Sequence, residues 1–515
     1  MGLSEAGSVE LSSVETQSPE PKAAGEPSGE FEWTRKHTIT LTVLCLAAFL
    51  DAIDITVVNV ALPAIKEGLG FSQSSLAWVV NAYLILFGGF LLLGGRVGDM
   101  IGRRRVFIWG VVAFTAASLG SGLAQSAGTL TVTRGLQGLA GAFVAPMTLA
   151  ILNGVFPEGK PRDKAFGIWG GITGVAGAVG LILGGLLGGG PSWRWLFYIN
   201  IPIGIFMVLA ALRFIPNDRP ERTTTRAFDV VGAVTGTGGI SLLCYAIAQV
   251  DHHPWGSGRT VSLLIASALI LGYFVVHEAR IASQPLVPLS LFANRSVLGA
   301  NVVSALCGCA MFATFYLATL YQQQVLHFSA LKTGLGFIPL TVLLLCAAPV
   351  GPKLVTKFGM RPVIAAGAVV SAAGLALFAR ISADGGLLMD IILPSVVLSI
   401  GFGILFIPMT MAALNGVPEE RSGVASAMVN MTRFVGGSVG LAVISTIATM
   451  RTNHLLDESH PALESLNSGL QIGFAVAAGL MVVTAVAALA LFREDGRVPA
   501  AGASESLPEA VAVGK

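Results

Sequence analysis

The sequence has few charged side chains. Asp, Glu, Lys and Arg make up 12% of its 515 residues, whereas ordinary soluble domains carry about 25%. Long apolar runs that lack all four residue types alternate with short basic connections. This pattern excludes a soluble fold and is typical of a chain that crosses a membrane many times. The net charge of +2 and the absence of a basic face argue against a nucleic-acid partner.

Cysteine and metal-ligand patterns are also scarce. The five cysteines all fall inside apolar runs, so neither a disulfide framework nor a zinc site is indicated. None of the seven histidines has the i, i+4 spacing of a helical metal site. Residues 154–161, GVFPEGKP, imitate a phosphate-binding loop but end in Pro161, which has no hydroxyl for magnesium. We therefore expect no metal, no cofactor and no ATP-binding site, so that any energy the protein uses must come from an ion gradient.

The first 32 residues contain seven glutamates and one lysine. They lack the basic start and apolar core of a cleaved signal peptide. We predict a disordered cytosolic tail over residues 1–34 and a second cytosolic tail over residues 493–515.

Apolar runs of about 20 residues, the length of a membrane-spanning helix, recur along the rest of the chain. The predicted fold class is an all-α polytopic membrane protein with fourteen spans. They are expected near residues 39–61, 76–94, 106–124, 129–152, 165–187, 195–215, 229–250, 260–280, 297–320, 333–351, 362–380, 391–414, 422–447 and 469–492.

The basic residues divide unevenly between alternate connections. One side of the membrane receives 21 Lys and Arg residues and the other side receives 6. Because cytoplasmic connections are enriched in these residues, the 21 are predicted to be cytoplasmic. An even number of spans places both termini on that side. We expect a multi-pass protein of a bacterial cytoplasmic membrane.

A weak internal repeat suggests a duplicated architecture. GRVGDMIGRRR begins at Gly95 and PKLVTKFGMR begins at Pro352, and both are short basic turns between apolar helices. We predict an N-terminal six-helix bundle over residues 35–215, a linker with two inserted spans over residues 216–296, and a C-terminal six-helix bundle over residues 297–492.

Four stretches in the first half resemble the fourteen-span drug:proton antiporter branch of the major facilitator superfamily. They are LDAIDITVVNVALP from Leu50, the basic loop from Gly95 to Arg105, RGLQGLAGA from Arg134, and the glycine-rich fifth span followed by SWRWLFYINIPIG from Ser192. The chain departs from that pattern in two places. Gly180 precedes leucine where the branch has Gly-Pro, and Thr356 replaces the acid of the second-half loop.

The resemblance implies two bundles that rock around a midplane site and export drug-like or antibiotic small molecules as protons enter. The expected partners are a small amphiphilic substrate, protons and the lipid bilayer, and the expected state is a monomer. Export or import of one specific metabolite or siderophore by the same fold is the main alternative. A membrane enzyme would need His, Asp or Ser clustered at one interface, and we find no such cluster. A sensor without turnover is a further alternative.

Two acidic residues lie deep in the first predicted span. Asp51 and Asp54 are three residues apart, hence on one helix face. A charged side chain at mid-bilayer costs at least about 2.5 kcal/mol, so an intramembrane carboxylate is a candidate for function. The plainer alternative is an edge position or a hydrogen bond to a neighbouring helix. The resemblance favours Asp54 for proton coupling, and the choice between the two stays open.

Two arginines occupy otherwise apolar spans and must face a cavity, water or a carboxylate. The resemblance gives Arg134 a role in proton coupling, since a cation that approaches or leaves Asp54 changes its proton affinity. A static ion pair is the alternative. Arg433 has no equally specific pattern and is a further candidate.

The loop after the second span holds Gly95, Asp99, Gly102 and Arg103. Its arginines can be topology signals alone, but a topology signal needs no acid. The resemblance implies that this loop is a conformational latch, with Asp99 facing the start of the thirteenth span near Ser422.

The glycines of the fifth span recur every three or four residues and are expected to share one smooth helix face. Close helix packing explains them, and sliding between the two bundles needs the same smoothness. The candidates for packing and switching are Gly174, Gly177, Gly180 and Gly184.

Overall fold

The computed structural model describes residues 32–188, 190, 192–217, 229–250 and 253–492. The predicted terminal tails therefore lie outside the described residues, apart from residues 32–34. Within the described ranges the chain is helical and has no strand. Fourteen stretches are long and apolar enough to cross a membrane, which confirms the predicted fold class and number of spans.

The first six spans are formed by eight helices. Their bounds are α1 Arg35–Leu69, α2 Gln73–Leu76, α3 Trp78–Ile101, α4 Arg103–Gly122, α5 Ala127–Val155, α6 Lys160–Gly188, α7 Trp195–Tyr198 and α8 Asn200–Phe214. Two further spans follow, α9 Val230–Ala248 and α10 Gly258–Val276, and α10 continues as the π-helical segment η1 His277–Ile281.

The last six spans begin after a 3-10 turn, η2 Leu289–Ala293. Their helices are α11 Arg295–Leu320, α12 Ala330–Gly336, α13 Ile338–Ala347, α14 Val350–Phe358, α15 Met360–Phe378, α16 Leu393–Leu414, α17 Glu419–Asp457 and α18 Ala462–Leu491. Two π-helical segments, η3 Tyr321–Val325 and η4 Leu387–Ile392, extend α11 and precede α16.

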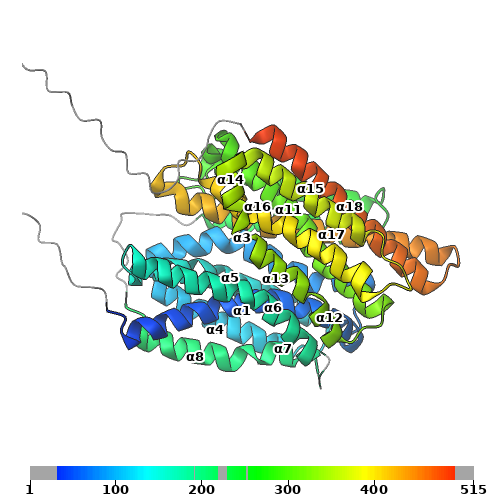
Figure 1. Cartoon of the computed structure of the whole chain (residues 1–515), viewed down its shortest axis with the longest axis horizontal. Coiled ribbons are helices and arrows are strands. Elements are labelled where there is room, and N and C mark those ends of the chain that lie inside the picture. Colours follow the sequence, from blue (N-terminus) through cyan, green and yellow to red (C-terminus); the bar gives the residue numbers. More distant parts are fainter. Residues whose placement is uncertain (1–31, 189, 191, 218–228, 251–252, 493–515) are drawn as a thin grey trace, which may run out of the picture.

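Two six-helix bundles lie side by side (Figure 1). In the first bundle α1 packs on α6, and α5 packs on both α3 and α4. In the second bundle α11 packs on α17 and α18, and α15 packs on α16 and α18. The bundles meet through α3 with α17 and through α6 with α12. The start of α1 and the end of α18 lie toward the same side, on the left of Figure 1.

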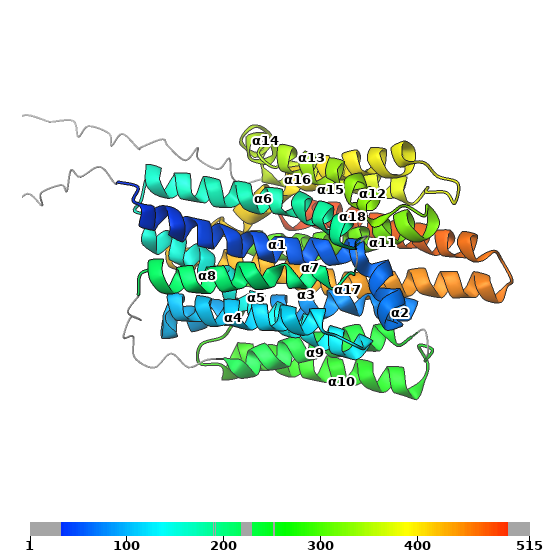
Figure 2. The same ribbon diagram turned by 90° about the horizontal axis from the view of Figure 1, so that it is seen from below.

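The inserted helices α9 and α10 pack against each other at one edge of the molecule (Figure 2). Helix α9 also contacts α3 of the first bundle and α17 of the second. The inserted pair therefore covers one of the two seams between the bundles.

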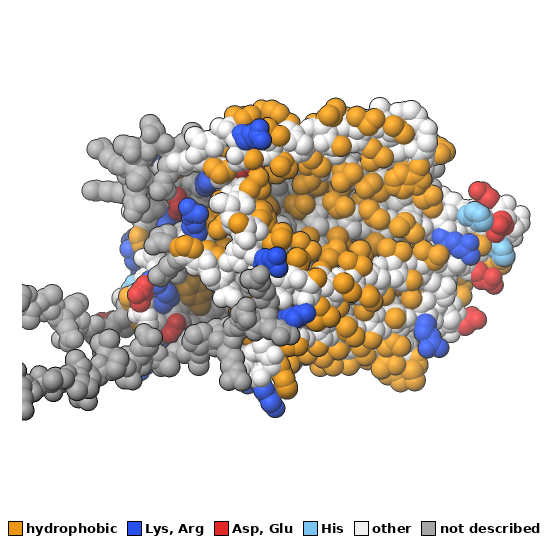
Figure 3. Space-filling model, turned by 90° about the horizontal axis from the view of Figure 1, so that it is seen from above, with side chains coloured by type: hydrophobic (Ala, Val, Ile, Leu, Met, Phe, Trp, Pro, Cys, Tyr) orange, Lys and Arg blue, Asp and Glu red, His pale blue; other side chains and the backbone are white. Residues whose placement is uncertain are grey.

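The middle of the surface is apolar, and charged side chains gather toward the two ends (Figure 3). Large apolar side chains such as Val132, Leu209 and Leu269 are each more than 60% exposed. An exposed apolar surface of this extent marks a membrane-embedded protein rather than a soluble one.

The two basic turns of the internal repeat share a backbone feature. Gly102, between α3 and α4, has φ of 110°, and Gly359, between α14 and α15, has φ of 85°. Only glycine adopts such angles without a steric cost from a Cβ atom. The same sharp helix-to-helix turn is therefore built at both positions.

Two spans differ from a simple reading of the hydropathy. The tenth is divided into α12, α13 and α14. Pro339 lies in the first turn of α13 and Pro349 directly precedes α14, and proline cannot donate a helical hydrogen bond. Helix α17 has 39 residues, about 58 Å at 1.5 Å per residue, so it projects beyond a bilayer. Helix α6 runs unbroken from Lys160 to Gly188, and Leu181 stands where the resembled branch has proline.

Candidate functional site: a buried carboxylate and guanidinium in the first bundle

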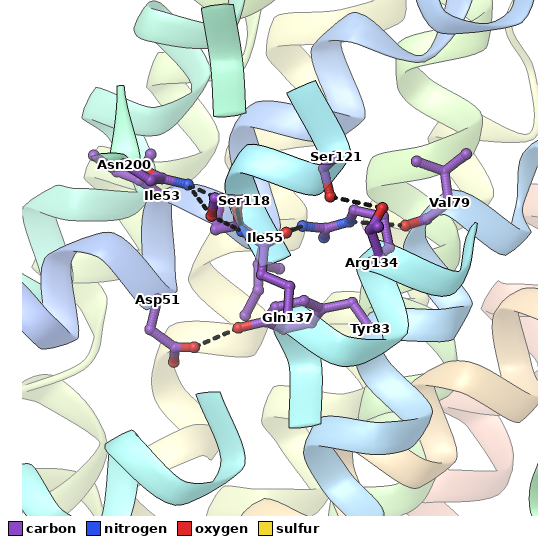
Figure 4. A network of polar contacts seen from close by, with 12 residues as sticks. Asp51, Ile53, Ile55, Val79, Tyr83, Ser118, Ser121, Arg134, Gln137 and Asn200 are labelled. Carbon is purple, nitrogen blue, oxygen red and sulfur yellow. Dashed lines mark hydrogen bonds and ion pairs between the residues drawn. The ribbon is translucent and has the colours of Figure 1, made fainter. Parts of the chain in front are cut away.

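Asp54 belongs to a buried polar network inside the first bundle, and the network residues Arg134, Gln137, Ser118 and Asn200 are labelled in Figure 4. Its side chain is fully buried. One carboxylate oxygen pairs with Arg134, and the other accepts hydrogen bonds from Gln137 Nε2 at 2.6 Å and Asn200 Nδ2 at 3.2 Å. Ser118 Oγ accepts from the same two amides, at 2.8 and 3.2 Å. The network thus joins helices α1, α4, α5 and α8, and α5 and α8 supply the groups that contact the carboxylate.

Arg134 is also buried, with 1% of its side chain exposed. Besides Asp54, its guanidinium donates to Gln137 Oε1 at 2.7 Å and to the backbone carbonyl of Val79 at 3.2 Å. It also lies over the ring of Tyr83, 4.7 Å from the centroid. A buried arginine needs this many partners because an unpaired charge in an apolar interior is costly.

The local sequence explains how these groups converge. Arg134 and Gln137 are three residues apart on α5, so they share a helix face. Gly138, on the same helix, packs against α3. A Cβ at this position would lie 2.3 Å from the carbonyl oxygen of Tyr83. This glycine lets α5 approach α3 closely enough for Arg134 to reach Val79 and the Tyr83 ring.

Asp51 lies one helical turn away from Asp54 and is only partly buried. The Tyr83 hydroxyl donates to its Oδ1 at 2.5 Å (Figure 4). Asp51 also lines a cavity of about 20 Å³ together with residues of α4, α5 and α8, enough for one water molecule. Tyr83 therefore touches both Asp51 and Arg134, and it joins the two predicted carboxylates into one assembly.

The basic loop forms its own contacts at the end of α3. Asp99 and Arg103 form an ion pair at 3.2 Å, and both side chains are about half exposed. Arg103 also donates to the backbone carbonyl of Ala150 on α5 at 3.2 Å. In this conformation Asp99 bonds to the turn itself, and its predicted latch contact near Ser422 stays a prediction.

The glycines of α6 meet different neighbours along the helix. A Cβ on Gly180 would meet Thr56 Oγ1 at 2.1 Å, and one on Gly184 would meet the Val57 carbonyl at 2.8 Å, so these two pack against α1. A Cβ on Gly174 would instead meet Leu345 of α13, and a Cβ on Gly177 would have no neighbour outside its own turn of helix within 4 Å. Spacings of three and four residues keep these glycines on one side of α6, but the element that this side meets changes along the helix, from α13 near Gly174 to α1 near Gly180 and Gly184.

Arg433 lies in α17 of the second bundle, away from the Asp54 network. Its Nη2 donates to Asn430 Oδ1 at 2.8 Å, one turn earlier on the same helix. The rings of Phe406 and Phe434 lie 5.7 and 5.4 Å from the guanidinium carbon. The structure thus separates Arg433 from the three proton-coupling candidates, which it brings together.

A second polar cluster joins the inserted helices to the first bundle. His277 Nε2 lies 2.8 Å from Asp229 Oδ1, and Glu278 Oε2 accepts from the Val287 N–H at 3.0 Å. The Arg96 guanidinium donates to the carbonyls of Gln284 and Pro285, each at 2.5 Å. Burial raises the pKa of Asp229, but hydrogen bonds from the Gly232 N–H and from His277 outweigh it, so the net shift is downward.

Sequence reasoning missed several members of these two clusters. Gln137 and Asn200 stand inside the stretches RGLQGLAGA and SWRWLFYINIPIG, which pointed to them without assigning a role. Tyr83 and Ser118 carried no signal beyond being polar groups in apolar spans. The described residues contain no group of three or more His, Cys, Asp or Glu side chains that could hold a metal ion.

The sequence matches the family model of the Major Facilitator Superfamily over residues 44–441. The chain belongs to this superfamily. A puromycin resistance protein of Streptomyces alboniger is 36% identical over 90% of this chain and 92% of its own. A cephamycin export protein of Amycolatopsis lactamdurans is 38% identical over 83% of this chain and 88% of its own.

A solved structure shares the fold at low sequence identity. The crystal structure of the POT family transporter PepTSo superposes with a TM-score of 0.65 at 14% identity, covering 89% of this chain and 99% of that one. The resemblance of the chain to fourteen-span drug exporters is therefore confirmed at the level of sequence family and of fold, and the chain is a membrane transporter, not an enzyme.

Proposed function

We propose that this protein is a proton-driven exporter of antibiotic-type small molecules. The observation that carries the proposal is the buried pair of Asp54 and Arg134 within a bundle of membrane helices. An intramembrane carboxylate is costly unless it is paired, and a pair that can be broken by one proton is a switch. The relatives named for puromycin resistance and cephamycin export support the substrate class.

The proton acts on this switch by neutralising Asp54. The Arg134 guanidinium then loses its carboxylate partner and keeps only Gln137, the Val79 carbonyl and aromatic faces. The free energy of this state rises, which favours a rearrangement of α1 against α5. One proton that enters across 100 mV supplies about 2.3 kcal/mol, so one or two protons sustain a useful gradient.

Asp51, which accepts a hydrogen bond from Tyr83, offers a second site for the proton within one helical turn of Asp54. Asp51 is partly exposed and borders a water-sized cavity, whereas Asp54 is sealed. We therefore assign proton exchange with the aqueous phase to Asp51 and control of the helix arrangement to Asp54. Glycine packing of Gly180 and Gly184 against α1 lets α6 move with that helix.

The arrangement in the membrane is part of the proposal. Both termini are cytoplasmic, because the connections on their side hold 21 of the Lys and Arg residues and the opposite ones hold 6. The bundles extend over residues 35–215 and 297–492 with the inserted pair between them, and the transporter acts as a monomer in the bacterial cytoplasmic membrane. The loop with Gly95, Asp99, Gly102 and Arg103 acts as the latch at the cytoplasmic ends.

The test is substrate-dependent proton flux in liposomes that contain the purified protein. Puromycin, a cephamycin, tetracenomycin C and lincomycin form the substrate panel, because relatives are named for each of them. Proton release that follows addition of several of these compounds supports multidrug export. Proton flux with one compound alone favours a dedicated exporter, the second candidate, which the single-antibiotic names of those relatives support. No proton flux with any substrate contradicts the proposal.

A further inference from the structure

Arg433 has fewer hydrogen-bond partners than Arg134, the other arginine in the interior of a span. Arg134 has a carboxylate, an amide and a backbone carbonyl around it. Arg433 bonds only to Asn430 among the described residues, and its Nε is buried without a partner. No described carboxylate forms an ion pair with it, and the residue is partly exposed. One edge of the Arg433 guanidinium is therefore left open.

The surroundings of Arg433 are built from aromatic and close-packed groups. Phe406 of α16 and Phe434 of α17 flank the guanidinium. On the opposite side the helix backbone is pressed against α11, where a Cβ on Gly308 would lie 2.0 Å from the Arg433 carbonyl. The backbone is thereby fixed, and the side chain extends from a rigid position.

This position lies across the bundle interface from the proton network. The ring of Phe434 is 4.6 Å from that of Phe87 on α3, and Phe87 stacks on Tyr83 at 5.6 Å. Tyr83 in turn lies under Arg134 and bonds to Asp51. A continuous series of ring contacts therefore links Arg433 to the proton-coupling residues.

A purely structural arginine would have its donors filled by the protein. Arg96 illustrates this case, because its guanidinium donates to two backbone carbonyls in the segment after α10. Arg433 has no such acceptors in the part of the chain that the structure describes. An arginine presents its donors as a planar fork that matches a carboxylate or a similar oxyanion. The flanking rings suit an aromatic or apolar body next to that anionic group.

We infer that Arg433, with Phe406 and Phe434, binds the anionic group of an amphiphilic aromatic substrate. This inference rests on the proposed export function and names a substrate class for it. Asn430 holds one side of the guanidinium and leaves the other for the oxyanion. Export of an anion and entry of a proton are both driven by a negative interior, so the transport of anions depends on membrane potential more steeply than the transport of neutral molecules.

The binding test uses 1-pyrenebutyrate, an aromatic carboxylate, and its neutral methyl ester as probes. Binding to the purified protein in nanodiscs is measured by equilibrium dialysis, with empty nanodiscs subtracted. The variants are Arg433→Gln, Arg433→Lys and the control Arg380→Gln, which removes the same charge from an exposed position at the end of α15.

We expect Arg433→Gln to weaken binding of the acid at least 10-fold and to leave that of the ester within 2-fold. Arg433→Lys keeps the positive charge but lacks the planar guanidinium. We expect its affinity for the acid to lie between that of the native protein and that of Arg433→Gln. Arg380→Gln changes neither. Absence of saturable acid binding to the native protein, or an unchanged acid affinity in Arg433→Gln, contradicts the inference. An equal loss for acid and ester also contradicts it, since that result shows a structural role.

Proton flux separates this inference from the proposed function. If the protein binds the acid through Arg433 but shows no substrate-dependent proton flux, the anion site is supported and the proposed antiport is contradicted. If the protein exports puromycin with proton flux but binds the acid and the ester equally well, the proposed antiport is supported and the anion site is contradicted.

Discussion

Removing the charge of Asp54 leaves the Arg134 guanidinium buried with no carboxylate beside it. Breaking a buried ion pair in this way costs about 3–5 kcal/mol. Arg134 keeps Gln137 Oε1 at 2.7 Å, the Val79 carbonyl at 3.2 Å and the Tyr83 ring, so we expect Asp54→Asn to lie at the lower end, about 3 kcal/mol. Arg134→Gln strands the carboxylate and costs a similar amount.

The double variant removes both charges and leaves no unpaired ion. We expect it to cost about 4 kcal/mol rather than the sum of the two single changes, which is a coupling energy of about 2 kcal/mol, within the range for contacting residues. The assay is reversible denaturant unfolding in detergent micelles for the native protein and the three variants.

A matched control exists in the same bundle. Asp99 and Arg103 form an ion pair with side chains 50% and 40% exposed, and a solvent-exposed pair couples by less than about 1 kcal/mol. The same cycle with Asp99→Asn and Arg103→Gln should therefore be nearly additive. Additive free energies for the Asp54 and Arg134 cycle would refute a tight buried pair, as would equal coupling in both cycles.

Three further predictions follow from other parts of the structure. Asp99→Asn should impair efflux in cells while drug binding in detergent stays intact, because the residue is exposed and remote from a midplane cavity; equal loss of both at normal protein level opposes the latch. Gly184→Ala should destabilise the protein by about 1–3 kcal/mol relative to Gly177→Ala in unfolding assays, because only Gly184 meets backbone atoms of α1; equal stabilities contradict this packing. The pKa of Asp229 is lowered on folding, so its stabilising effect is present above its unfolded pKa of about 3.9 and is lost as pH falls through the folded value. Asp229→Asn should therefore lower the thermal midpoint at pH 7 and match the native protein once the pH lies below the folded pKa of Asp229; a difference that persists under those conditions contradicts the assignment.

Much of the fold followed from composition and hydropathy. Fourteen apolar runs of sufficient length predicted fourteen spans, because the bilayer sets the length of a helix that crosses it. Breaks within a span were harder to foresee. Pro339 and Pro349 divide the tenth span, yet the hydropathy there is continuous, since proline alters hydrogen bonding more than it alters hydrophobicity.

The candidate site was predictable where a charge stands in an apolar span. Asp54 and Arg134 were found in this way, and the structure brings them into contact. Their neutral partners Ser118 and Tyr83 were not predicted. Burying such uncharged side chains in a membrane span costs little, so they do not change the hydropathy pattern noticeably. Helical spacing also did not predict the neighbours of the α6 glycines, because Gly174 meets the second bundle and Gly184 meets the first. Which neighbour a helix face meets depends on the packing of all the helices.

The central claim is that a proton on Asp54 drives export. The most direct measurement is substrate-dependent proton flux in liposomes that contain the native protein, Asp54→Asn or Asp51→Asn at matched protein density, with one neutral and one cationic substrate. We expect Asp54→Asn to abolish proton flux with both substrates while equilibrium exchange of substrate persists, because the variant mimics the protonated state. Asp51→Asn should slow proton flux without abolishing it, since Asp54 still carries the proton. Undiminished drug-dependent proton flux in Asp54→Asn would contradict the account.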